Sequence, residues 1–425
     1  MKRHTVLAAM VLCALIAGTR PAVAEPDFYV PPAQIAPGPG AIVRTQPMPL
    51  FATVPGIAGN WPGTAQLVMY TSQLQDGSPT AVTGTFIDAT RPWQGNGPRP
   101  TVVIAPGTVG QGDQCAASRA FALGLNITTA PFSLSANQEA LSANVWSALG
   151  ARVFVTDYVG LGTPGVHTYV NRIEEAHAVL DAARAANALS GSGSDTPIAL
   201  WGYSQGGGAT AAAAELQPSY APELNLKGTW AGAPPANLLD TLAAIDGNLI
   251  GGAIGFAING FVARYPELQK PLEERMSPAG RAMLATLATE CIGDVITNQP
   301  FLETSTFTND GRSLLDNLSA IPEAIPIFDR QRIGNLTPTS PVLITSGRND
   351  DTVPYGQARQ LAVDWCANGA DVTFRTNELP PILPGATLPN HFGPELIDGY
   401  GTNNAVSYVL DRLNGVPIAS GCTLS

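Results

Sequence analysis

A serine flanked by glycines stands where the sequence changes from an apolar run to a stretch of small residues. The motif Gly-Tyr-Ser-Gln-Gly at 202–206 follows the run IALW at 198–201, with Ser204 at its centre. A tight turn between a buried strand and a helix needs side-chain-free residues two before and two after the serine. Such a turn exposes the hydroxyl at the edge of a sheet. The pattern predicts that Ser204 is a nucleophile, and an inert serine in a glycine-rich turn is the alternative.

A serine hydroxyl needs a base to take its proton, and histidine is the usual one at neutral pH. The chain has four histidines. We expect His4 to be removed with an N-terminal leader, His177 to lie in a helix and His167 to lie in a glycine-rich loop. His391 alone follows both the serine and the candidate acids, as the order serine, acid, histidine requires on this kind of turn. We therefore predict His391 as the base, with a surface histidine as the alternative.

The acid that orients the histidine should follow a late strand. The apolar run 342–345 leads into two adjacent aspartates, Asp350 and Asp351. We predict Asp350, because it comes first after the strand. Asp351 would then be a solvated neighbour or a helix cap. Asp157, which ends another apolar run, precedes the serine and is expected to be structural.

The oxyanion of an acyl-transfer intermediate needs two backbone donors. One is expected from the N–H of Gln205, at the start of a helix whose dipole also favours negative charge. The second should come from the glycine-rich loop 106–112, which follows the apolar run TVVIA at 101–105. We assign it to Thr108, with Val109 as the alternate and a plain glycine turn as the alternative reading of the loop.

Metal, nucleotide and nucleic-acid chemistry find little support in the sequence. Cysteines form no C-x-x-C pair, histidines are few, and no P-loop is present. Gly160, Gly162 and Gly165 match a dinucleotide fingerprint, but Pro164 interrupts the start of the helix that such a site needs. The net charge of −11 repels a phosphate backbone. We expect no metal, no cofactor and no nucleic-acid partner.

The elements that must position these residues alternate between short apolar runs and helical patterns. The 425 residues, 45% of them apolar, can bury the core of one large domain or two modest ones. We expect buried strands at 101–105, 153–156, 198–201, 228–231 and 342–345, a further strand at 372–376, an antiparallel pair at 65–71 and 81–87, and helices at 172–189 and 209–215. This alternation predicts an α/β fold with a mostly parallel, doubly wound sheet.

The chain divides into a leader, an arm, a core and an insertion. A basic start, an apolar run and an Ala-Val-Ala site predict a signal peptide at 1–24, because the run is shorter than the ~20 residues of a membrane span. The Pro- and Gly-rich segment 25–60 is expected to be an extended arm. The largely helical pattern of 238–335 predicts a cap over the sheet, with two crossover helices as the alternative. The core would comprise 61–237 and 336–425.

The signal peptide predicts a secreted, extracellular or envelope protein, and this compartment bears on the cysteines. Cys13 would leave with the leader, and an even number would remain, at Cys115, Cys291, Cys366 and Cys422. An oxidising compartment favours two disulfides, although spacing alone leaves three connectivities open. Buried free thiols are the alternative.

Several short motifs, taken together, resemble the secretory lipase family, the Candida lipase A-like α/β-hydrolases, in its actinobacterial branch. They are PGT (106–108), GDQCAAS (112–118), DY with a glycine (157–160), GYSQGG (202–207), YAPEL (220–224) with Gly232 and Pro234, and Asp350 with VPY (353–355). The likeness extends over nearly the whole mature chain. Ala117 departs from it, because the family usually has Ala-Pro-Ser after the first cysteine.

The resemblance implies an α/β-hydrolase fold with a helical cap and a Ser204, Asp350, His391 triad. It also implies disulfides between Cys115 and Cys291 and between Cys366 and Cys422. The expected activity is hydrolysis of acylglycerols or related lipid esters through an acyl-serine intermediate, with transient contact with a lipid surface and no obligate protein partner. Acyl transfer, cleavage of a polyester or envelope lipid, a peptidase and a non-catalytic envelope-binding protein are the rival interpretations.

Overall fold

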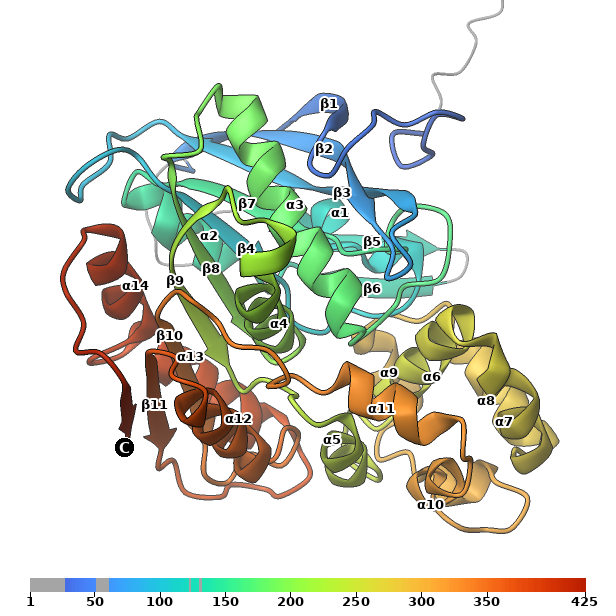
Figure 1. Ribbon diagram of the computed structural model, residues 1–425. Coiled ribbons are helices and arrows are strands. Elements are labelled where there is room, and N and C mark those ends of the chain that lie inside the picture. The colour runs from blue at the N-terminus through green and yellow to red at the C-terminus, as the bar shows by residue number, and fades with distance from the viewer. Residues whose placement is uncertain (1–26, 51–60, 122–123, 130–131) are drawn as a thin grey trace, which may run out of the picture.

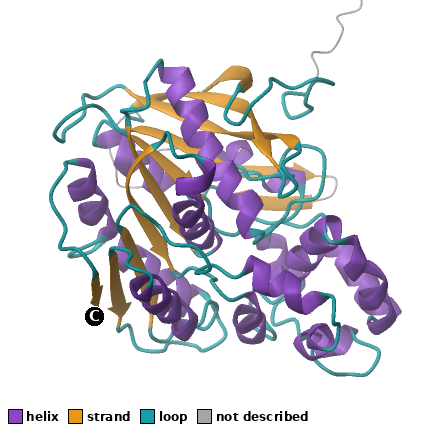
Figure 2. Ribbon diagram, viewed as in Figure 1, coloured by secondary structure: helices purple, strands orange, loops and turns teal. Residues whose placement is uncertain are grey.

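The computed structural model describes residues 27–50, 61–121, 124–129 and 132–425, so the predicted signal peptide lies outside the described residues. A ten-stranded sheet in the order β1-β2-β3-β7-β4-β8-β9-β10-β11-β12 runs through this part of the chain (Figures 1 and 2). Its strands are β1 (Ile42–Met48), β2 (Gly63–Gln73), β3 (Pro79–Ala89), β4 (Thr101–Ala105), β7 (Arg152–Thr156), β8 (Pro197–Tyr203), β9 (Asn225–Gly232), β10 (Val342–Gly347), β11 (Val372–Asn377) and β12 (Cys422–Leu424).

The N-terminal strands are antiparallel. β2 and β3 form the predicted antiparallel pair, and β3 also pairs antiparallel with β7. β1 pairs antiparallel with β2, although the sequence analysis expected no strand within the arm at 25–60. β1 is an edge strand whose residues are exposed or half-buried, so it needs no alternating apolar pattern that could have marked it.

The other strands of the sheet run parallel, from β7 through to β12. Each predicted apolar run lies inside one of these strands, and β4, β8 and β10 are buried along their whole length. The prediction of a mostly parallel sheet is therefore confirmed. Because the carboxyl ends of parallel strands meet at one edge, the loops that follow β4, β8, β10 and β11 lie together there.

Helices cover both faces of the sheet. One face packs on α3 (Arg172–Ser190), α4 (Gln205–Tyr220) and α12 (Tyr355–Ala367), and the other on α1 (Ala117–Phe121), α2 (Ala140–Ala148) and α14 (Ala405–Leu413). Alternate strand residues serve the two faces, as Val103 and Leu200 join the first core cluster while Val102 and Trp201 join the second. The two predicted helices are confirmed as α3 and α4, the latter starting earlier than expected, directly after Ser204.

A helical insertion separates β9 from β10. It contains α5 (Leu238–Ile245), α6 (Ala253–Arg264), α7 (Gln269–Arg275), α8 (Pro278–Leu287), α9 (Ile292–Asn298), α10 (Leu314–Ser319) and α11 (Ala324–Gln331), with an apolar core of its own. These helices gather beside the sheet, coloured from the green of α5 through yellow to orange in Figure 1. The insertion is helical, as expected from the sequence, and it contains more than the two crossover helices of the alternative. We call this insertion the cap.

Two further features were not predicted. A small antiparallel hairpin, β5 (Leu125–Thr129) with β6 (Phe132–Ala136), forms a separate two-stranded sheet. After β11, the chain makes a π-helical turn, η4 (Leu388–Phe392), that continues into α13 (Gly393–Tyr400). Within the described residues, no helix has both the length and the apolar character needed to cross a membrane.

Candidate active site

Ser204 occupies the turn between β8 and α4, with φ 57° and ψ −123°. A residue other than glycine rarely adopts a positive φ, and such a conformation costs of order 1–3 kcal/mol. Two backbone hydrogen bonds hold it: the Ser204 N–H donates to the carbonyl of Gly232 at 2.9 Å, and the Ser204 carbonyl accepts from the N–H of Gly208 at 2.9 Å. The strained turn directs the side chain away from the sheet core and toward the loops at its carboxyl edge.

The glycines beside the serine are required by close backbone contacts. A Cβ at Gly202 would lie 2.2 Å from the carbonyl oxygen of Gly206, and a Cβ at Gly206 would lie 2.0 Å from that of Ala105. Neither backbone neighbour can move without breaking the packing of β4, β8 and α4. The sequence motif therefore has the geometric cause that was expected of it.

Asp350 and His391 meet at the same edge. The His391 Nδ1 lies 2.8 Å from Asp350 Oδ2, and both side chains are fully buried. The other carboxylate oxygen, Oδ1, accepts the N–H groups of Thr352 and Val353, each at 2.9 Å. With both oxygens fixed, the carboxylate holds the imidazole in one orientation.

Asp351 has a different role from the one expected. Its carboxylate Oδ2 accepts the N–H of Gly385 at 2.7 Å and the side-chain amide of Asn390 at 2.9 Å. The prediction that Asp351 is a solvated neighbour or a helix cap is therefore wrong. The segment before His391 folds back over the loop after β10, so Asp351 fixes the residues that lead into η4.

The environment of His391 favours its protonated form. Burial of the ring works to lower its pKa, but the charge and hydrogen bond of Asp350 outweigh this effect and raise the pKa above the ordinary value of 6.5. The backbone is fixed by two hydrogen bonds, from the hydroxyl of Tyr203 to the His391 carbonyl at 2.7 Å and from the His391 N–H to the Thr387 carbonyl at 2.8 Å. The second ring nitrogen, Nε2, has no hydrogen-bond partner among the described residues.

The other two described histidines lie outside this arrangement. His177 is in α3, as expected, and its ring stacks on Tyr220 with centroids 3.9 Å apart. His167 is buried in a loop, where burial lowers its pKa to about 4. Its Nδ1 contacts the carbonyl of Val159 at 3.0 Å. Neither ring is placed to assist Ser204 as a base.

Thr108 and Gln205 both line the hollow next to Ser204. Gln205 is the first residue of α4, so its N–H has no partner within the helix. Its side chain instead turns toward the core and donates to Glu175 Oε1 at 2.7 Å. The Thr108 N–H has no hydrogen-bond partner among the described residues. The Val109 N–H, the alternate donor, likewise has no hydrogen-bond partner among the described residues, and the Val109 carbonyl accepts the N–H of Ile292 in the cap.

Two residues that the sequence analysis missed hold the Thr108 loop in place. The Glu139 Oε1 accepts the N–H of Gly107 at 3.1 Å, and the Gln138 side-chain amide donates to the Thr108 carbonyl at 2.9 Å. Burial raises the pKa of Glu139 to about 8. No motif marks these residues, which lie just before α2. Asp157 is structural, as expected, and binds the side chains of Ser118 and Thr83.

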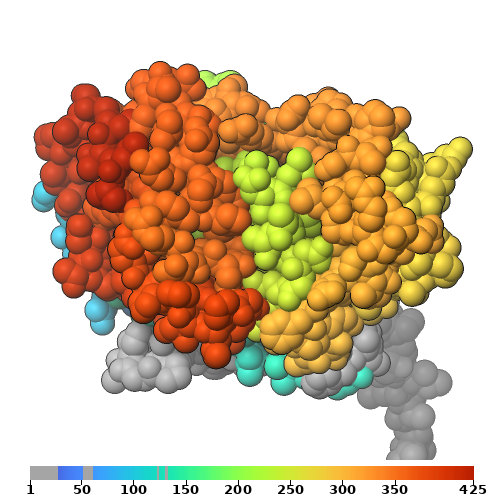
Figure 3. All heavy atoms as spheres, turned by 90° about the horizontal axis from the view of Figure 1, so that it is seen from below, coloured from blue at the N-terminus to red at the C-terminus, as the bar shows by residue number. Residues whose placement is uncertain are grey.

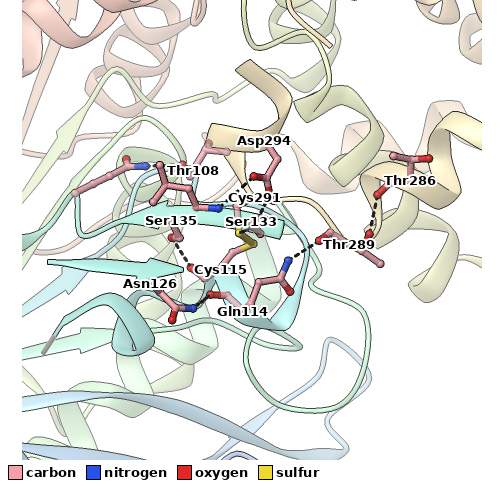
Figure 4. The surroundings of a disulfide bond; sticks show 12 residues. Thr108, Gln114, Cys115, Asn126, Ser133, Ser135, Thr286, Thr289, Cys291 and Asp294 are labelled. Atoms are coloured by element: carbon pink, nitrogen blue, oxygen red, sulfur yellow. Dashed lines mark hydrogen bonds between the residues drawn. A yellow bond between two sulfur atoms is a disulfide. The ribbon is translucent and has the colours of Figure 1, made fainter. Parts of the chain in front are cut away.

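A disulfide ties the same loop region to the cap. Cys115 and Cys291 are joined, and the N–H of Gln111 donates to the carbonyl of Glu290 at 2.9 Å beside them. Figure 4 shows the bond enclosed by polar contacts from the β5–β6 hairpin and the start of α9. A second disulfide joins Cys366 to Cys422. These are the pairings that the resemblance implies.

Two hollows meet at Ser204. One, which we call the apolar pocket, extends under the cap and is lined by Leu242, Ile245, Ala253, Ile258, Phe261 and Leu272. The other, which we call the His391 cleft, lies between η4, α13 and the β5–β6 hairpin, with walls from Leu134, Gln138, Ile296, Phe392, Glu395 and Tyr400. Ser204 and Thr108 line both hollows, whereas His391 lines only the His391 cleft.

Sequence comparison places this geometry among known proteins. A family model described as secretory lipase matches residues 131–421. The secreted triacylglycerol lipase LIP1 of Malassezia furfur is 31% identical over 231 residues, 54% of this chain and 45% of the relative, so the match spans about half of that relative. The secreted triacylglycerol lipase LIP5 of Malassezia globosa is 28% identical over 380 residues, 85% of this chain and 73% of the relative.

Two further likenesses bear on activity and on fold. A Mycobacterium tuberculosis protein named a probable inactive lipase is 28% identical over 377 residues, 84% of this chain and 77% of the relative. Among solved structures, Candida antarctica lipase A in its closed state has a TM-score of 0.75 at 22% identity, covering 94% of this chain and 90% of that one. The structural likeness shows that the fold is the α/β-hydrolase fold.

Proposed function

The chain belongs to the secretory lipase family, and we propose that it is a secreted serine ester hydrolase that cleaves acylglycerols or related lipid esters. One observation carries the proposal most strongly. His391, which is paired with the buried Asp350, and Ser204 on its strained turn both line one cleft, and Nε2 of the histidine has no protein partner among the described residues. That nitrogen is the atom a serine base would use.

The proposed mechanism assigns a role to each group. Ser204 Oγ attacks the ester carbonyl while Nε2 of His391 takes its proton, and Asp350 stabilises the charged ring. The N–H groups of Gln205 and Thr108 bind the oxyanion. When the tetrahedral intermediate collapses, His391 gives the proton to the leaving alkoxide and acyl-Ser204 remains. Water, deprotonated by His391, then attacks the acyl group, and the acid leaves as Ser204 regains a proton.

The apolar pocket supports a lipid substrate. Its lining comes mainly from aliphatic and aromatic side chains of the cap, which can bury an acyl chain at about 25 cal/mol per Å² of apolar surface. Exposed apolar side chains also gather on one segment beside the cleft. We call Ile382, Leu383, Leu388, Leu396 and Ile397 the apolar rim. Such a group of exposed apolar residues favours contact with a lipid surface.

A hydrolase assay with a matched pair of variants tests the proposal. Ser204→Ala should lower the kcat for p-nitrophenyl octanoate by at least about 10³-fold, because the nucleophile is lost. Ser219→Ala, an exposed serine at the other end of the same helix, should leave the rate unchanged. A wild-type protein that is folded yet inactive on every ester would favour the non-catalytic alternative, a reading made pertinent by the relative named a probable inactive lipase.

A further inference from the structure

Glu395 places a carboxyl group in the wall of the His391 cleft. It lies in the first turn of α13, four residues after His391, so both side chains project from the same side of the continuous η4–α13 segment. Its neighbours in the cleft wall are largely apolar, among them Ile296, Phe392 and Leu396. An ionisable side chain among these apolar residues is a candidate for contact with a polar group of the substrate.

The carboxyl group has no hydrogen-bond partner among the described residues, although it is only partly exposed. Burial raises the pKa of Glu395 to about 7, with the nearby His391 acting in the opposite direction. The other acids of the site differ in this respect. Asp350 accepts two backbone N–H groups and Glu139 accepts one. Because the carboxyl group opens onto the cleft and no protein group holds it, a polar group of a bound ligand can take the place of the water that hydrates it.

The position of His391 decides which part of an ester would lie beside Glu395. In the proposed mechanism the proton on Nε2 passes to the oxygen of the leaving alcohol. The alcohol moiety must therefore lie next to the imidazole ring of His391. His391 lines the cleft and not the apolar pocket. The acyl chain therefore fits the apolar pocket, and the alcohol moiety fits the cleft that contains Glu395.

Resting on the function proposed above, we propose that Glu395 accepts a hydrogen bond from a free hydroxyl group on the alcohol moiety of the substrate. Glu395 is then a specificity-determining residue, which favours esters of polyols such as partial acylglycerols over esters of simple alkanols. The hydroxyl would replace the missing protein partner of the carboxyl. An alkyl group in its place would leave the carboxyl desolvated without a partner, which disfavours the alkanol ester.

The test compares two esters that share an acyl chain and a three-carbon alcohol, 1-monooctanoylglycerol and propyl octanoate. The measured quantity is the ratio of their kcat/KM values. The wild type should prefer the glycerol ester. Glu395→Leu should lower the ratio at least about tenfold, whereas Glu395→Gln, which keeps a carbonyl acceptor, should retain most of it. Asp398→Asn is the control on the same helix, because Asp398 does not line the cleft and its Oδ1 accepts a hydrogen bond from Asn377.

An unchanged ratio in Glu395→Leu, including the case where both esters lose activity in equal proportion, would overturn the proposal, since the residue would then act through His391 or through folding. If that variant does not fold, wild-type protein decides: glycerol should capture the octanoyl group from the acyl-enzyme more efficiently than 1-propanol, and equal capture would refute the proposal. Hydrolysis of propyl octanoate by the wild type, absent in Ser204→Ala, shows that the proposed function holds whichever result is found.

Discussion

His391 depends on Asp350 for its basicity. Burial alone makes an imidazole harder to protonate, and the fully buried His167, which has no carboxylate on its ring, shows this effect in a pKa lowered to about 4. His391 is buried as well, but its pKa is raised because Asp350 pairs with Nδ1. The two rings thus provide a comparison within one molecule of burial with and without a charged partner.

Removal of that charge should reverse the pKa shift. In the wild type, the base is the neutral ring, so kcat/KM should be lost as the pH falls through a His391 pKa that lies above 6.5. In Asp350→Asn, burial is opposed only by the smaller effects of the Glu395 and Asp351 charges, so the His391 pKa should fall, as NMR titration of the ring can measure. The His167 signal, with its pKa near 4, is the internal reference. A His391 pKa that is the same in both proteins would contradict this account.

At the scale of elements, the features that the sequence predicted best are those that steric contacts between neighbouring backbone segments require. The turn between β8 and α4 could be predicted because steric contacts require its glycines. A Cβ at Gly202 would clash with the backbone of Gly206, and a Cβ at Gly206 would clash with the adjoining strand β4. The support of the Thr108 loop by Glu139 was not predicted, since the contact to Gly107 joins residues 32 apart and uses a side chain that could equally be solvated. β1 was not predicted for a related reason, because an edge strand needs no clear alternation of apolar and polar residues.

The support from Glu139 predicts different outcomes for two substitutions. Burial raises the Glu139 pKa to about 8, so the group is mainly neutral at pH 7, and Glu139→Gln should keep both the acceptor and the activity. Glu139→Leu leaves the Gly107 N–H unsatisfied, at a cost of about 1–3 kcal/mol, and should lower kcat about tenfold or more. Thermal unfolding measured in parallel separates this effect from loss of fold. Wild-type kcat in Glu139→Leu would show that the loop needs no support.

At the scale of the whole molecule, the cap and the C-terminal part of the core together form the face that Figure 3 presents. There the yellow-green residues at the start of the cap lie between the orange-to-red core and the remaining cap helices. Asn248 in the cap donates to the Asp351 carbonyl at 2.7 Å, which links the two parts near the site. The predicted domain boundaries at 238 and 335 remain a proposal.

The apolar rim should matter only where the substrate forms an interface. Leu383 is its most exposed member, at 71%. Leu383→Asp adds a charge that must be desolvated on contact with lipid, so the ratio of activity on emulsified trioctanoylglycerol to activity on a soluble butyrate ester should fall severalfold. Val416→Asp, at an exposed apolar residue after α14 and outside the rim, should keep the wild-type ratio. An equal ratio in all three proteins would exclude a role for the rim.

The central claim is that Ser204 is an activated nucleophile, and covalent labelling tests it most directly. Treatment of the folded protein with a fluorophosphonate, followed by intact-mass and peptide mass spectrometry, should give one adduct per chain, on the peptide that contains Ser204. Ser204→Ala should give none, and His391→Ala should react far more slowly because no base takes the serine proton. A wild-type protein that hydrolyses esters yet stays unlabelled at Ser204, or a label that persists in Ser204→Ala, would contradict the account.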